Sequence, residues 1–133
     1  MQWDATKNGG FSSADKTWLP VHENYEKINV KLEDKEAASL LNTIRALLEI
    51  RKKEPAFQEG SLEWIKGLPE NILGYRRILN DTAFIVLLNF NETEKEFPIE
   101  ATDVIFKLSA GSRVSEHEIR LDGYGGVILR HPH

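Results

Sequence analysis

The acidic side chains are the largest set of residues in this sequence that could do chemistry. The chain of 133 residues holds 21 Asp and Glu residues, and paired carboxyl groups can cleave glycosidic bonds. A retaining enzyme of that kind needs two carboxyl groups about 5 Å apart, one of them with a raised pKa. Here the acids lie in turns or alternate with polar residues, as in EKEF (94–97) and EHEIRL (116–121). This pattern is typical of a solvated face, so we expect no catalytic residue in the chain.

The histidines, serines and glycines suggest no other reactive site. His22, His117, His131 and His133 are scattered, and the two imidazoles of the terminal HPH form a weak ligand set. The serines have no neighbouring base in a recognised nucleophile motif. GYGG (123–126) precedes an expected strand, whereas a phosphate-binding loop precedes a helix. We therefore expect neither a metal ion nor a cofactor.

Aromatic side chains gather in the opening segment, where Trp3, Phe11, Trp18 and Tyr25 lie among turn residues. The faces of Trp and Tyr stack on sugar rings, so one interpretation is a loop that contacts carbohydrate. The other is that these rings attach the loop to its own domain or to a neighbouring one. The aromatic residues expected in the core of later strands are Trp64, Phe84, Phe90, Phe97 and Phe106.

Composition and charge exclude several classes of protein. The net charge of −4 comes without a basic face, so nucleic acid is not an expected partner. No run approaches about 18 apolar residues, so we expect no membrane association. The absence of cysteine removes disulfides and thiolate metal sites together. The first residues lack the basic and apolar regions of a signal peptide, which favours a cytoplasmic protein.

The elements that must position these residues fall into three segments. Residues 1–33 carry turn signals and no helical or strand period. Residues 34–55 predict one amphipathic helix, with Asp34 as its N-cap and Pro55 as its stop. Its apolar stripe consists of Ala37, Leu40, Leu41, Ile44, Leu47 and Leu48.

From residue 56 onward the sequence predicts strands. Seven short runs rich in β-branched and aromatic residues are separated by turn signals: SLEWIK, ILGYRRIL, TAFIVLLNF, EKEFPI, VIFKLS, EHEIRL and GGVILR. The run AFIVLLNF is almost continuously apolar, which predicts a central strand covered on both faces. The expected fold is therefore mainly β, an antiparallel Greek-key β-sandwich of about seven to eight strands behind an irregular loop and one helix.

An ordered series of phrases then resembles one family. These are MQWDATKNGGFSS (1–13), WLPVHENYEKINV (18–30), LEIRKKEP (48–55), FIVLLNFNET (84–93) and LDGYGGVILR (121–130). Together they are similar to the late part of α-glucosidases and oligo-1,6-glucosidases of the α-amylase superfamily, glycoside hydrolase family 13. The family usually reads NAGFS where this chain has NGGFS, and the likeness covers essentially the whole chain.

The resemblance implies that residues 1–54 form the end of a (β/α)₈ barrel and residues 55–133 a C-terminal β-sandwich. Barrel enzymes build their active sites from loops after the strands, so Gln2, Trp3, Asp4 and Trp18 are expected near outer sugar subsites of the parent enzyme. The family's catalytic carboxylates precede anything that matches MQWD, so Met1 would correspond to an internal methionine. On this reading an α-glucan or oligosaccharide binds only in the context of the parent enzyme.

Other readings remain open. The chain could act as a stand-alone α-glucan-binding or partner-docking module, or form the tail of a trehalose synthase or sucrose isomerase. In each case the apolar stripe needs a cover, because a large exposed apolar patch is unusual on a monomer. We therefore expect self-association through the exposed helix face.

Overall fold

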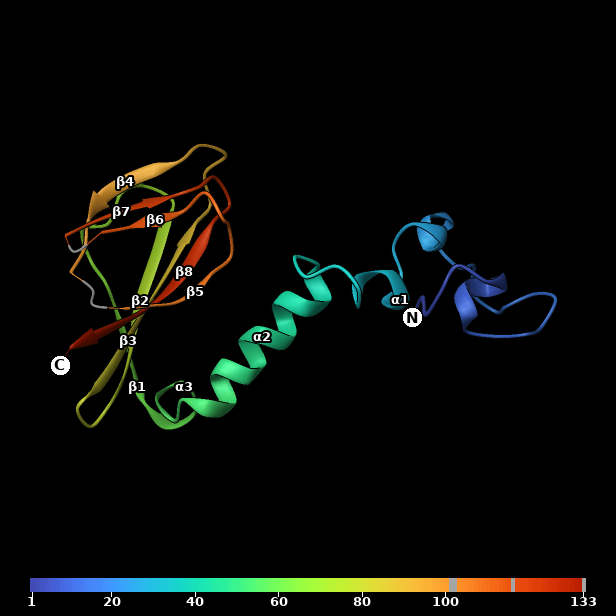
Figure 1. Ribbon diagram of the computed structural model, residues 1–133, viewed down its shortest axis with the longest axis horizontal. Coiled ribbons are helices and arrows are strands. Elements are labelled where there is room, and N and C mark those ends of the chain that lie inside the picture. The colour runs from blue at the N-terminus through green and yellow to red at the C-terminus, as the bar shows by residue number, and fades with distance from the viewer. Residues whose placement is uncertain (101–102, 116, 133) are drawn as a thin grey trace. The chain divides into compact units, whose positions relative to one another are not determined.

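The computed structural model describes residues 1–100, 103–115 and 117–132, so His133 lies outside the described part. The chain divides into two compact units, Met1–Ile50 and Arg51–His133. In Figure 1 the first unit is drawn in blue to blue-green, and the strands of the second run from green to red.

The first unit is built from short turns and the greater part of one longer helix. Two 3-10 turns, Lys7–Gly10 and Glu23–Glu26, precede the one-turn helix α1 (Val30–Glu33). Helix α2 then runs over Leu40–Lys53 and crosses the boundary between the units. None of the helices in the described ranges has the length and apolar character needed to span a bilayer.

The predicted start of the long helix at Asp34 is wrong. Asp34 ends α1 as its C-cap, and α2 begins six residues later, at Leu40. The Ser39 hydroxyl accepts a hydrogen bond from the backbone N–H of Asn42, and the Glu33 carboxylate accepts one from the N–H of Leu41. These two acceptors satisfy N–H groups that the first turn of a helix leaves free. Ala37 therefore lies outside the helix, while the predicted stop at Pro55 is confirmed.

After the last residues of α2, the described residues of the second unit form a short helix and eight strands. Helix α3 (Ala56–Glu59), which the sequence pattern missed, directly follows Pro55. The strands are β1 (Ser61–Trp64), β2 (Ile72–Leu79), β3 (Thr82–Asn89), β4 (Lys95–Pro98), β5 (Asp103–Lys107), β6 (Arg113–Val114), β7 (Glu118–Leu121) and β8 (Gly126–Pro132). Seven of them were predicted, and the two-residue strand β6 was not.

The strands form two antiparallel sheets, one of five strands in the order β1-β2-β3-β8-β5 and one of three in the order β4-β7-β6. The chain changes sheet after β3, β4, β5 and β7, so β3 pairs with β8 rather than with its successor. Crossing between sheets in this way is typical of Greek-key sandwiches. The expected antiparallel β-sandwich is confirmed.

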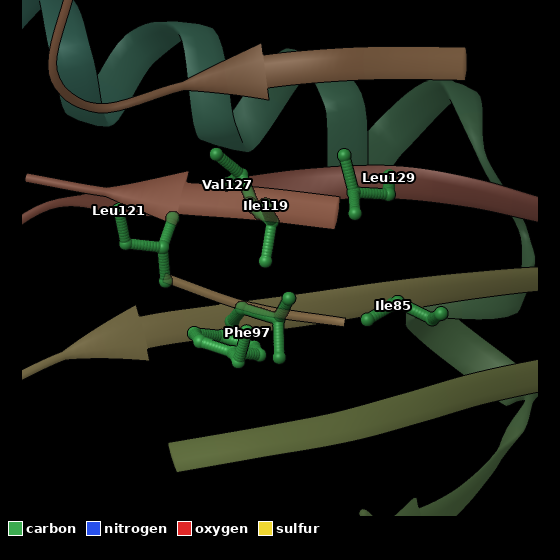
Figure 2. Close-up of a cluster of buried hydrophobic side chains, with 7 residues drawn as sticks. Ile85, Phe97, Ile119, Leu121, Val127 and Leu129 are labelled. Carbon is green, nitrogen blue, oxygen red and sulfur yellow. The ribbon is translucent and has the colours of Figure 1, made fainter. Parts of the chain in front are cut away.

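The core lies between the two sheets. Figure 2 shows side chains from both sheets pointing toward one another there. The buried cluster consists of Ile85 and Leu87 on β3, Val127 and Leu129 on β8, Phe97 on β4, and Ile119 and Leu121 on β7. Each such side chain contributes about 1.5–3 kcal/mol through its removal from water.

Strand β3 is covered on both faces, as predicted. Ala83, Phe84, Ile85, Val86 and Leu87 are all buried in succession. On the face away from the core, Phe84 packs against Phe57 of α3 with their ring centroids 4.8 Å apart. A continuous apolar run in this strand therefore reflects two packed faces rather than one.

Two of the aromatic residues expected in the core are instead exposed. Trp64 is 62% exposed and Phe90 is 60% exposed. Trp64 lies on β1, an edge strand of the five-stranded sheet, and Phe90 follows the last residue of β3. Phe84 and Phe97, on strands β3 and β4, are buried as predicted.

Candidate functional site

An apolar groove of about 870 Å³ lies within the opening segment of the first unit. The residues that line it are Met1, Gln2, Phe11, Thr17, Trp18, Leu19, Pro20, Val21 and His22. The indole of Trp18 is 96% exposed, and Phe11 and Leu19 are also exposed. A groove of this size with an accessible indole suits the flat face of a sugar ring or of another planar group.

Gln2 lies in the groove, but its side-chain donors are already engaged. Its Nε2 donates hydrogen bonds to the carbonyl oxygen of His22 (3.1 Å) and to Oδ1 of Asn24 (2.9 Å). Its backbone oxygen accepts from the N–H of Val30 (3.0 Å). Gln2 therefore ties the two ends of the opening segment together, a role that needs contacts about 20 residues apart in sequence.

Trp3 is a second backbone tie and is not among the groove-lining residues. Its N–H donates to the carbonyl oxygen of Gly9 (2.7 Å), and its own carbonyl accepts from the N–H of Lys31 (3.0 Å). The first bond closes the short loop from Trp3 to Gly9, and the second attaches Trp3 to the start of α1. The indole ring is about half exposed.

Asp4 also lies away from the groove lining. Its carboxylate accepts hydrogen bonds from both the hydroxyl and the backbone N–H of Thr6. Because both bonds stabilise the charged form, with the hydroxyl bond the larger effect, the pKa of the Asp4 carboxyl lies below its ordinary value. The geometry is that of an Asx turn, which holds a loop in shape.

The structure therefore places Gln2 and Trp18 on one groove and leaves Trp3 and Asp4 outside its lining. Sequence reasoning did not single out the segment Leu19–Pro20–Val21 or Asn24. The only sequence signal for them is the extended WLPV phrase, since a Pro favours extended backbone before it. Among the described residues, no group of three or more His, Cys, Asp or Glu side chains could hold a metal ion.

Comparisons with known proteins show which proteins the chain is similar to. Residues 1–60 match the family model "Alpha amylase, catalytic domain". The chain is 44% identical, over 68% of its length, to a salivary α-glucosidase of Aedes aegypti. It is 31% identical, over 98% of its length, to an amino acid transporter heavy chain of Rattus norvegicus.

The chain is also similar to solved structures. An isomaltulose synthase of Erwinia rhapontici NX5, solved with sucrose, superposes with a TM-score of 0.88 at 28% identity over 97% of this chain. The chain spans 15% and 21% of the length of the two relatives and 24% of the isomaltulose synthase. It belongs to the α-amylase family (glycoside hydrolase family 13) and corresponds to the C-terminal part of such a protein.

Proposed function

We propose that the chain is the non-catalytic C-terminal part of an α-glucosidase-type glycoside hydrolase that acts on α-glucosidic linkages. The observation that carries this proposal is where the family match stops. The catalytic-domain model matches residues 1–60, and the first strand of the sandwich begins at Ser61. The first unit is then the end of the catalytic barrel, and the sandwich braces that barrel from its C-terminal side.

We further propose that the chain by itself does not hydrolyse glycosides. Retaining hydrolysis needs a carboxylic acid whose pKa is raised, so that it can donate a proton near neutral pH. The pKa of the Asp4 carboxyl is lowered by its hydrogen bonds to Thr6. That direction suits a fixed anion and not a general acid.

In the parent enzyme the groove would lie at the rim of the active site, with Trp18 and Gln2 nearest to the outer sugar subsites. Trp18 is the better candidate for direct contact because its face is free, whereas the donors of Gln2 are bound within the loop. Trp3 and Asp4 would then shape the loop rather than touch sugar. We also propose that the parent enzyme is cytoplasmic, as expected from the sequence.

Two assays on the purified chain test this function. Incubation with p-nitrophenyl α-glucoside should release no nitrophenol above the rate of a heat-denatured sample. Titration with maltose or isomaltose should leave tryptophan fluorescence unchanged, since the remaining subsites would come from the barrel. Turnover typical of an enzyme would overturn the non-catalytic assignment. Saturable quenching that disappears in Trp18→Ala would instead support a stand-alone α-glucan-binding module.

A second candidate keeps the same role but changes the parent reaction to isomerisation of a disaccharide. The observation that favours it is the likeness to isomaltulose synthase over 97% of this chain. The two candidates are distinguished by the parent enzyme, assayed with sucrose: a hydrolase releases glucose and fructose, and an isomerase yields a second disaccharide.

We also propose that the isolated chain associates with a second copy of itself through α2. Leu40, Ile44 and Leu48 form an exposed apolar stripe on this helix, with Leu40 68% exposed. In a purified sample the available partner for this stripe is a second copy of the chain. Pairing two such stripes removes both from water at once. In the parent enzyme the same stripe would face the barrel.

A further inference from the structure

A second cavity lies within the sandwich unit, at one open end of the space between the two sheets. Its volume is about 430 Å³, and the residues that line it are Arg76, Pro98, Ile99, Glu100, His117 and His131. Three of these six side chains carry nitrogen donors. None of them belongs to the opening groove or to a role assigned so far.

The strand register explains why two of the donors meet there. Arg76 on β2 pairs with Ile85 on β3, and His131 on β8 pairs with Ala83, two residues away on β3. Directly opposed residues share a face of the sheet, and Ile85 points into the core. Arg76 and His131 therefore lie on the inner face, Arg76 beside Ile85 and His131 one inward-facing position past Leu129. The segment after β4 and His117, just before β7, approach from the other sheet.

Arg76 is the unusual member of this set. Its Nε atom is buried and has no hydrogen-bond partner in the part of the chain that the structure describes. A guanidinium stays charged at every pH at which the protein is folded, and a buried N–H without an acceptor costs free energy. Other arginines on these strands are satisfied: Arg77 donates to the carbonyl oxygens of Ala56 and Gly60.

Two carboxylates are near enough in the fold to be considered as partners of Arg76. Glu63 stands opposite it on β1, and Glu100 lines the cavity. Within the described ranges neither forms an ion pair with it, whereas Arg120 and Arg130 do pair with glutamates. The Arg76 guanidinium is therefore available to a ligand in the cavity.

We infer that this cavity is a binding site for a small oxyanion, a carboxylate or phosphate group, held by Arg76 with His117 and His131 as additional donors. A planar guanidinium offers two parallel N–H groups that match two oxygens of such a group. The charge-assisted bonds would engage the Arg76 guanidinium next to its buried Nε–H, and each imidazole can donate one further bond. Pro98 and Ile99 form the apolar wall that limits the size of the ligand.

The test is an NMR titration of the full ¹⁵N-labelled chain, because a buried arginine Nε–H gives a resolved signal. Inorganic phosphate and acetate are added separately, with sodium chloride holding the ionic strength constant. The expected result is a saturable shift of the Arg76 Nε–H and of the His131 ring signals. Saturation with phosphate alone assigns a phosphoryl ligand, and saturation with acetate assigns a carboxylate.

Three variants sharpen the result. Arg76→Gln should abolish the shift of the His131 ring, and Arg113→Gln, the same change at an exposed arginine on β6, should leave it intact. Glu100→Gln removes the carboxylate that lines the cavity and should tighten binding. An Arg76 Nε–H signal in the wild-type chain that stays still with both anions would overturn the proposal, whether or not Arg76→Gln folds. A shift of the Arg76 Nε–H no larger than the shift of the Arg113 Nε–H would also overturn it.

Discussion

The side-chain amide of Asn89 donates a hydrogen bond of 2.8 Å to the carbonyl oxygen of Asp122, 33 positions later in the sequence. The same Nδ2 lies within hydrogen-bonding distance of the carbonyl oxygens of Thr93 and Leu121. Its Oδ1 accepts from the backbone N–H and the side chain of Asn91. Asn89, which is 3% exposed, thus joins the end of β3 to the turn between β3 and β4 and to the turn after β7.

Replacement of Asn89 should destabilise the sandwich strongly. Asn89→Ala leaves the buried carbonyl oxygen of Leu121 and the partly buried carbonyl of Asp122 and N–H of Asn91 without this partner, and each unsatisfied buried group costs about 1–3 kcal/mol. We expect the free energy of unfolding to fall by roughly 3 kcal/mol, measured by urea denaturation. Asn80→Gly is the matched control, since Asn80 is exposed and has a φ of 51°, which glycine adopts without strain. A similar loss in both variants would contradict the role given to Asn89.

The packing of α3 on β3 makes a second prediction. Phe57 is buried against Phe84, so Phe57→Ala should create a cavity and lower the free energy of unfolding by about 3–5 kcal/mol. Phe90→Ala removes an equally large ring that is exposed, and its effect should stay within about 0.5 kcal/mol. Thermal unfolding monitored by circular dichroism separates the two. Equal shifts in the midpoint would mean that α3 detaches from the sheet in solution.

Two adjacent glycines in the opening loop should respond differently to alanine. Gly9 and Gly10 both have positive φ angles, of 62° and 68°, which a Cβ disfavours. A Cβ at Gly9 would meet only ordinary contacts, while one at Gly10 would lie 2.5 Å from Oδ1 of Asp4. Asp4 can move aside only by giving up its bonds to Thr6. We therefore expect faster proteolytic cleavage within residues 1–29 for Gly10→Ala than for Gly9→Ala, and equal rates would contradict the contact.

The Thr6 bonds also predict a pH effect on the opening loop. The pKa of Asp4 in the folded chain is lowered below its unfolded value, chiefly by the Thr6 hydroxyl. The charged form is therefore favoured by folding, and this stabilisation is present above the unfolded pKa and is lost as the pH falls through the folded pKa. A ¹³C titration of the Asp4 carboxyl should show the low value, and Thr6→Val should return it partway toward normal. An unchanged pKa in Thr6→Val would assign the shift to another group.

The strands were predictable from the sequence because their signal is local. ILGYRRIL matches β2 (Ile72–Leu79) residue for residue, and its ends are set by adjacent turn residues. Strand β6, at two residues, is too short for any period to register, and α3 is a single turn. The true start of α2 is set by the Ser39 and Glu33 acceptors, whereas the sequence pattern pointed to Asp34 as the N-cap.

The candidate site was less predictable because its parts act over long separations. That Trp18 is accessible follows from its place among turn residues. The hydrogen bonds from Gln2 to His22 and Asn24 could not be predicted, since sequence spacing says nothing about which loop residues meet. The inward orientation of Arg76 likewise appears only once the β2–β3 register is known.

The α2 stripe gives the last prediction. Leu48 is 59% exposed on the same face as Ile44, one helical turn away, so the pair presents continuous apolar surface. Light scattering after size exclusion should show a dimer of the chain at high concentration that dissociates on dilution. Leu48→Glu should give a monomer, because two buried carboxylates would repel each other across the paired helices. Lys53→Glu, a charge change at an exposed residue on a different face of the helix, is the control and should still dimerise. A wild-type monomer at every concentration would mean that the stripe does not pair with its own copy.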